Sequence, residues 1–217
     1  HASMAADLSH RETLMPIVDR SILRQAYAYW FGELEDRAAM PADKVPIWFQ
    51  GGEAVDAHIR ETFSAYFRPA ADTPWDVLSL SRQEQVGLVV LLDQFPRNSF
   101  RDSAEAFAFD SSVRAIAKRL IANSLDPFFL VERVFLYLPL EHSEAFEDQE
   151  QSVRLFRGLR RAVPEEGRAF AAQALDFAIK HYDIIARFDR FPHRNAALGR
   201  ASTPEEEAFL AEHGRGF

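Results

Sequence analysis

Apolar residues recur at helical spacing along almost the whole chain, and prolines or glycines separate the segments that carry this pattern. After the capping box Ser81–Glu84, for example, Val86, Val89, Val90 and Asp93 share one face of a helix. No segment shows the strict alternation of a β-strand, and the sequence lacks the Asn-Gly and Asp-Gly pairs typical of hairpins. The sequence therefore predicts an all-α fold, an antiparallel or superhelical array of about eight to ten helices.

Caps and prolines set the expected boundaries of these helices. Proline cannot continue a helix and disfavours helical angles in the residue before it, so helices should end near Phe95, Leu138 and Phe191. Residues 36–46 are expected to form a loop. Residues that can cap a helix or open its first turn mark the expected starts, which are Asp19 or Ser21, Gly52, Ser81, Asp102, Asp110 or Ser111, Asp126, Ser143, Pro164 and Thr203.

The composition suits one globular domain. With 217 residues, 47% of them apolar, a core can form over residues 21–217, after a tag remnant and polar leader in residues 1–20. The net charge of −8 argues against nucleic acid as a partner. The chain has no cysteine, no apolar run near the roughly 20 residues that span a bilayer, and no signal-peptide core in its first twenty residues. We therefore expect a cytoplasmic protein that does not associate with a membrane.

Two proline motifs resemble one another, although more than ninety residues separate them. Phe95-Pro96-Arg97-Asn98 and Phe191-Pro192-His193-Arg194-Asn195 both place an aromatic residue and a proline before a cation and an amide. In one interpretation they are structural corners, where Arg and Asn hydrogen-bond the last carbonyls of a helix. In the other, both corners face one cavity and the guanidiniums bind an anion. The sequence leaves both interpretations open.

Asp93 lies on the predicted buried stripe of its helix. A buried carboxylate needs a cation or several hydrogen-bond donors. We therefore expect a structural ion pair between Asp93 and an arginine of the second corner, namely Arg187, Arg190 or Arg194.

Three histidines lie in or near the motifs. His142 is flanked by Glu141 and Glu144, an arrangement that suits either an acid–base residue or a metal ligand. No HExxH or Glu-x-x-His pattern is present, so we expect no metal and no cofactor. His181 shares a stripe with apolar residues and is interpreted as a core residue. His193 lies among arginines that disfavour its protonated form, so it is either a base for an acidic substrate or a structural cap.

The same motifs resemble those of the bacterial DUF924 family. The matching stretches occur in order and cover nearly the whole chain from Trp30 to Leu210; they are Leu92–Asn98, Tyr137–Glu144 with Gln149, Arg190–Asn195 with Leu198-Gly199-Arg200, and Ser202–Glu206. The resemblance implies a helical fold similar to tetratricopeptide repeats, in a family of unknown function. Asp189 departs from it, since the family usually has glycine there. The extra carboxylate between Arg187 and Arg190 weakens any anion site built from those two arginines.

Two classes of function follow from these observations. The first is a small-molecule protein and candidate enzyme that binds a small carboxylate or phosphate metabolite. Its expected ligand-binding residues are Arg97, Asn98, Arg190, Arg194 and Asn195, and its expected acid–base residues are Glu141, His142 and His193. The second class is a helical scaffold that binds a peptide or protein in a concave groove. A closed pocket shared by Arg97, His142, His193 and Arg194 would favour the first, and polar residues spaced along an open surface would favour the second.

Overall fold

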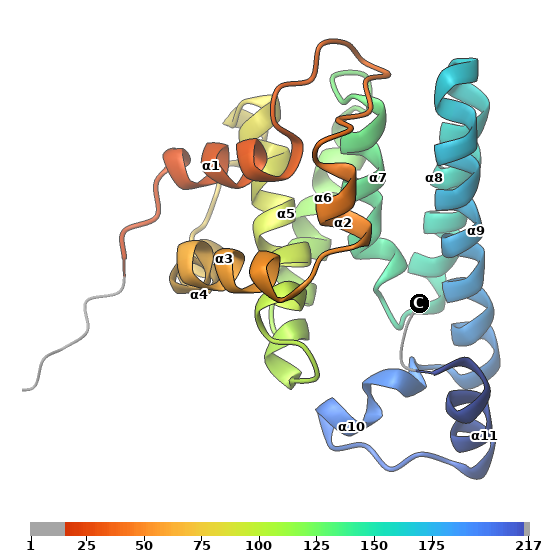
Figure 1. Cartoon of the computed structure of the whole chain (residues 1–217). Helices are drawn as coiled ribbons and strands as arrows, with labels where there is room; N and C mark the ends of the chain where they lie inside the picture. The colour runs from red at the N-terminus through yellow and green to blue at the C-terminus, as the bar shows by residue number, and fades with distance from the viewer. Residues whose placement is uncertain (1–15, 215–217) are drawn as a thin grey trace, which may run out of the picture.

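The computed structural model describes residues 16–214, which contain helices and no strand, as the sequence predicts (Figure 1). Eight helices in this range have ten residues or more. The α-helices are α1 (Arg20–Phe31), α2 (Val45–Phe49), α3 (Glu53–Phe63), α4 (Phe67–Asp72), α5 (Arg82–Ser99), α6 (Asp110–Asn123), α7 (Leu130–Glu141), α8 (Phe146–Ala162), α9 (Glu165–Phe188), α10 (Asn195–Leu198) and α11 (Pro204–His213). The 3-10 turns are η1 (Ser64–Tyr66), η2 (Val77–Ser79), η3 (Ala104–Phe107) and η4 (Pro192–Arg194).

Helix α5 runs through the middle of the structure, with α1, α3 and α4 on one side and α6 and α7 on the other (Figure 1). Its residues from Val86 to Leu92 are all buried, which is expected of a helix that is apolar on every side. Gly87 allows α1 to approach closely, because a Cβ atom there would lie 2.0 Å from the carbonyl oxygen of Leu23. Helices α8 and α9 form a long pair beside α7, and α10 and α11 lie at the lower end of the view.

The core between α1, α5 and α7 is aromatic. The ring of Trp30 packs edge-on against Phe95 and Phe135, with 5.6 Å between centroids in each pair. Trp48 of α2 joins this cluster, and its indole Nε1 donates a hydrogen bond to the Trp30 carbonyl at 2.9 Å. The short α2 is thereby held against the body of the protein.

Two helices continue through the prolines at which they were expected to end. Helix α5 passes Pro96 and reaches Ser99, and α7 passes Pro139 and reaches Glu141, so both expected ends were wrong. A proline near the end of a helix removes one backbone hydrogen bond. Phe95 and Leu140 are fully buried beside these prolines, and their packing outweighs the local preference.

Helix α9 ends at Phe188, three residues before the expected Phe191, and Asp189 is its C-cap in the left-handed conformation with φ 61° and ψ 7°. Glycine adopts this conformation without steric cost, which explains why a glycine suits this position.

Several expected starts also shift. Asp126 precedes a turn, and α7 begins at Leu130, where Glu132 Oε1 accepts a hydrogen bond from the Phe129 amide at 2.7 Å. Asp102 precedes the 3-10 turn η3 rather than an α-helix, and α8 begins at Phe146 rather than Ser143. The capping boxes at Ser81 and Thr203 are confirmed. Within residues 16–214, no helix combines the length and apolarity needed to cross a bilayer.

Candidate functional site

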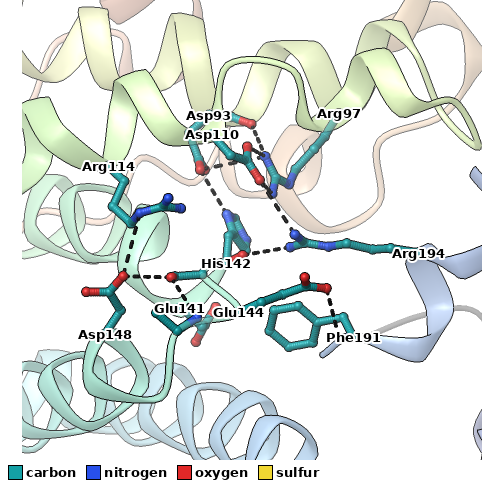
Figure 2. A network of polar contacts seen from close by, with 12 residues as sticks. Asp93, Arg97, Asp110, Arg114, Glu141, His142, Glu144, Asp148, Phe191 and Arg194 are labelled. Atoms are coloured by element: carbon teal, nitrogen blue, oxygen red, sulfur yellow. Dashed lines mark hydrogen bonds and ion pairs between the residues drawn. The ribbon is translucent and has the colours of Figure 1, made fainter. Parts of the chain in front are cut away.

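The ends of α5 and α7, the start of α6 and the turn η4 meet in a buried polar network (Figure 2). Its centre is the pair formed by Asp93 and His142. Asp93 is 1% exposed, and its Oδ1 lies 2.9 Å from Nδ1 of His142, while its Oδ2 accepts a hydrogen bond from Gln94 Nε2 at 2.7 Å. The periodicity of α5 therefore predicted the burial of Asp93 correctly.

The cation beside Asp93 is Arg97, one turn along α5, whose Nη1 lies 3.7 Å from Asp93 Oδ1. The expected partner from the second corner was therefore wrong. Residues four apart on a helix face each other, and this local pair is available without any distant contact. Burial disfavours ionisation of Asp93. The electrostatic interaction with His142, then that with Arg97, and the hydrogen bonds from His142 and Gln94 outweigh this effect and hold the pKa of Asp93 below its usual value.

Arg97 and Arg194 both approach Asp110 at the start of α6. Arg97 binds it through two hydrogen bonds of 2.8 and 2.9 Å, and Nη1 of Arg194 lies 3.7 Å from its Oδ2. Arg194 also donates to the His142 carbonyl oxygen at 2.9 Å, and its guanidinium lies between the rings of Phe107 and Phe191. Two arginines and two aspartates thus balance each other's charge within the network.

Glu141 lies outside this balance. It is 3% exposed, and its Oε1 has no hydrogen-bond partner among the described residues. Burial and the negative charge of Asp93 raise the pKa of Glu141 to about 8, although Arg97 acts in the opposite direction. Glu141 therefore holds its proton at neutral pH. Its main-chain carbonyl is fixed separately, by a hydrogen bond of 2.7 Å from Gln149 Nε2.

Burial, followed by the charge of Arg97, lowers the pKa of His142, against the effect of Asp93. The imidazole is therefore neutral at pH 7. Because ionised Asp93 can only accept, Nδ1 of His142 carries the hydrogen and donates it to Asp93. We infer that Nε2 is the unprotonated nitrogen.

Glu141 and His142 line a cavity of about 350 Å³ between α2, α5, α7, α8 and α9. Most of the wall is apolar and much of it is aromatic; the lining residues are Trp48, Phe49, Gln94, Val134, Phe135, Leu138, Glu141, His142, Phe156, Phe170, Gln173, Ala174, Phe177 and His181. Cavities of this size and composition are typical of small-molecule sites.

The other two histidines lie close to this pair. The ring centroids of His142 and His181 are 6.2 Å apart, and His181 Nδ1 lies 2.8 Å from the Phe177 carbonyl oxygen. Burial lowers the pKa of His181 to about 3. Burial and the charge of Arg194 lower the pKa of His193 to about 4. His181, interpreted from the sequence as a core residue, is buried and also lines the cavity.

The residues expected to share one pocket line two cavities. His142 lines the cavity described above, while Arg97 and His193 line a neighbouring recess of about 340 Å³ beside Phe107. Arg194 lines neither of them. The four side chains nevertheless lie close together. Arg194, next to His193 in the chain, donates to the His142 carbonyl oxygen, and both Arg194 and Arg97 approach Asp110.

The other expected ligand-binding residues have structural partners. Asn98 donates to Asp56 of α3 at 2.9 Å. Arg190 binds Glu206 through hydrogen bonds of 2.7 and 2.9 Å, and Asn195 contacts the same carboxylate at 3.3 Å, which ties the second corner to α11. For these three residues the geometry supports the structural interpretation of the motifs.

Glu144 attaches the second corner to the end of α7. Its carboxylate accepts a hydrogen bond from the Phe191 amide at 3.0 Å (Figure 2). It also accepts two hydrogen bonds from Arg200 at 2.9 Å. Within residues 16–214, no group of three or more His, Asp or Glu side chains is arranged to hold a metal ion.

Sequence reasoning missed Asp110 and the aromatic walls of the cavity. Asp110 was expected only as a helix start, which is the ordinary role of an aspartate in that position. Phe49, Phe135 and Phe170 have the spacing of ordinary core residues, and no local pattern indicates that they border a cavity.

The profile of a bacterial family of unknown function, DUF924, matches residues 26–214. The chain is also similar to the solved structure of a protein of unknown function from Agrobacterium tumefaciens. That similarity has a TM-score of 0.59 and 35% sequence identity, covering 82% of this chain and 99% of that one. No curated protein matches the chain. Because the family profile spans most of the sequence, the chain belongs to the DUF924 family.

Proposed function

We propose that this protein is an enzyme that transfers protons on a small molecule bound in the aromatic cavity. The observation that carries the proposal is the pairing, in one cavity wall, of a neutral imidazole oriented by Asp93 with the buried carboxyl of Glu141. Adjacent titratable groups whose environments move their pKa values in opposite directions are typical of acid–base sites.

His142 is the proposed base. Its Nδ1–H is held by Asp93 at 2.9 Å, so Nε2 presents a lone pair and the ring cannot change tautomer without losing that hydrogen bond. The positive charge that forms when Nε2 takes a proton is stabilised by the carboxylate of Asp93. Arg97, bound to both Asp93 and Asp110, keeps that carboxylate in place.

Glu141 is the proposed acid. The reaction in this proposal begins when His142 Nε2 removes a proton from a carbon next to a carbonyl group. The electron pair of the broken C–H bond forms a carbon–carbon double bond, and the π pair of the carbonyl group moves to its oxygen, which receives the proton of Glu141. The reverse transfers return both groups to their starting states, so no oxidant, reductant or second substrate is consumed.

The arginines that were expected from the sequence to bind a carboxylate or phosphate metabolite do not bind the ligand in this proposal. Arg97 and Arg190 already bind carboxylates within the protein, and a carboxylate or phosphate ligand would compete with Asp110 and Glu206. The interior position of the polar network favours a small molecule over a peptide in a groove. The scaffold function and a likeness to tetratricopeptide repeats remain predictions.

Hydrogen–deuterium exchange tests this function without knowledge of the product. Small aldehydes and ketones are incubated with the protein in deuterium oxide, and loss of the C–H signals next to the carbonyl is followed by proton NMR. We expect the wild type to accelerate exchange for some of these carbonyl compounds. The His142→Asn variant should lower that exchange rate at least about tenfold. Equal rates with the two proteins would refute the assignment of His142 as the base.

A further inference from the structure

The walls of the cavity restrict the shape of the substrate. Six aromatic side chains from four helices border it, namely Trp48, Phe49, Phe135, Phe156, Phe170 and Phe177. Phe49 is 57% exposed, and its ring centroid lies 6.2 Å from that of Phe170. One water molecule, which has one non-hydrogen atom, occupies ~30 Å³ in the liquid. By this measure the cavity of about 350 Å³ has room for roughly a dozen non-hydrogen atoms. A flat apolar body such as a single substituted ring suits this space.

The charges around the cavity restrict the substrate further. No lysine or arginine is among the residues that line it. The nearby guanidinium of Arg97 binds Asp110 and lies close to Asp93. Arg97 lines the neighbouring recess instead of this cavity. An anionic ligand would therefore lose its hydration without gaining a counter-ion, a large cost in an apolar site. A neutral substrate avoids this cost.

Glu141 provides a polar contact that a neutral ligand can use. A protonated carboxyl group has one O–H donor, and Oε1 of Glu141 has no hydrogen-bond partner among the described residues. A buried donor without an acceptor is costly, and a ligand that brings an acceptor removes that cost. A carbonyl oxygen is such an acceptor and carries no charge.

We propose that the substrate class is neutral carbonyl compounds with an aromatic or similarly flat apolar body, bound with the carbonyl oxygen accepting a hydrogen bond from Glu141. This inference rests on the proposed function for the role of Glu141 and His142 in turnover. The binding preference itself follows from the cavity walls and can be measured separately.

The test compares three probes of similar shape at pH 7, acetophenone, benzoate and ethylbenzene, by titration calorimetry or ligand-observed NMR. Acetophenone should bind about three- to tenfold more tightly than ethylbenzene, the range expected of one neutral hydrogen bond, and more than about tenfold more tightly than benzoate. Glu141→Ala should reduce acetophenone to the affinity of ethylbenzene. Glu141→Gln should keep the preference, because its amide still donates.

A charge introduced at the wall gives an independent check that leaves Glu141 and His142 in place. Gln173 of α9 borders the cavity and is exposed, so Gln173→Lys should be tolerated in the fold. We expect this variant to raise the affinity for benzoate at least about tenfold while leaving acetophenone within about twofold. An unchanged benzoate affinity would contradict the argument that a missing cation excludes anions.

The outcomes separate the substrate class from the proposed function. Benzoate binding as tightly as acetophenone to the wild type, or failure of all three probes to bind, overturns the substrate class. Preferred binding of acetophenone without exchange of its methyl hydrogens in deuterium oxide supports the substrate class and counts against proton transfer. Accelerated exchange confined to charged or non-aromatic carbonyl compounds supports proton transfer and overturns the substrate class.

Discussion

Replacing Glu141 with glutamine should change how the stability of the protein depends on pH. The carboxyl group is 3% exposed, and burial followed by the charge of Asp93 raises its pKa from 4.5 to about 8. Between these two values the unfolded chain releases the proton while the folded protein keeps it. The folded state then binds more protons than the unfolded state, so the free energy of unfolding falls as pH rises through this window.

The magnitude follows from the width of the window. Each pH unit between the two pKa values lowers the free energy of unfolding by about 1.4 kcal/mol. At pH 7 the wild type has lost about 3 kcal/mol relative to pH 4.5, and the loss is complete above pH 8. Glutamine does not titrate, so Glu141→Gln should lack this loss. The cost of burying its amide is the same at every pH and cancels from the pH dependence.

Urea unfolding followed by tryptophan fluorescence at pH 5, 6, 7 and 8 measures this effect. We expect the stability of Glu141→Gln relative to the wild type to increase by about 2.5 kcal/mol between pH 5 and pH 7. Glu150→Gln, on the exposed face of α8, controls for the loss of one acidic group and should follow the wild type. Parallel pH profiles for the wild type and Glu141→Gln would show that Glu141 ionises normally, and would remove it as the proposed acid.

Three further predictions concern the core and the catalytic pair. Asp93→Ala should lower the free energy of unfolding by about 3–5 kcal/mol, because it leaves buried cationic and imidazole groups without their partner, and an unchanged urea midpoint would refute the pairing. Gly87→Ala should lower the free energy of unfolding by about 1–3 kcal/mol or more, because its Cβ atom would lie 2.0 Å from a backbone carbonyl oxygen of α1. The control Gly158→Ala, where the added Cβ atom meets open space, should be neutral or slightly stabilising in the same thermal melts. The exchange rate catalysed by the wild type should follow a bell-shaped pH profile. It should fall on the acid side, as His142 becomes protonated at a pH below the ordinary imidazole pKa, and above about pH 8 as Glu141 ionises, and a rate independent of pH would contradict both assignments.

The sequence by itself determined the helical class, the capping boxes at Ser81 and Thr203, and the burial of Asp93. These features depend on residues three or four positions apart, whose relative placement on a helix is set by the geometry of the backbone. They can therefore be predicted from spacing alone.

Only the tertiary structure decided where α5 and α7 end, which groups contact Asp93, and which residues border the cavity. Pro96 stays within α5 because its neighbours are buried, and His142 reaches Asp93 from another helix. Glu141 is displaced from its ordinary ionisation by burial and by a charge that is distant in the sequence. Each of these outcomes is the balance of contacts between segments far apart in the chain, and a local pattern contains no information about which segments will meet.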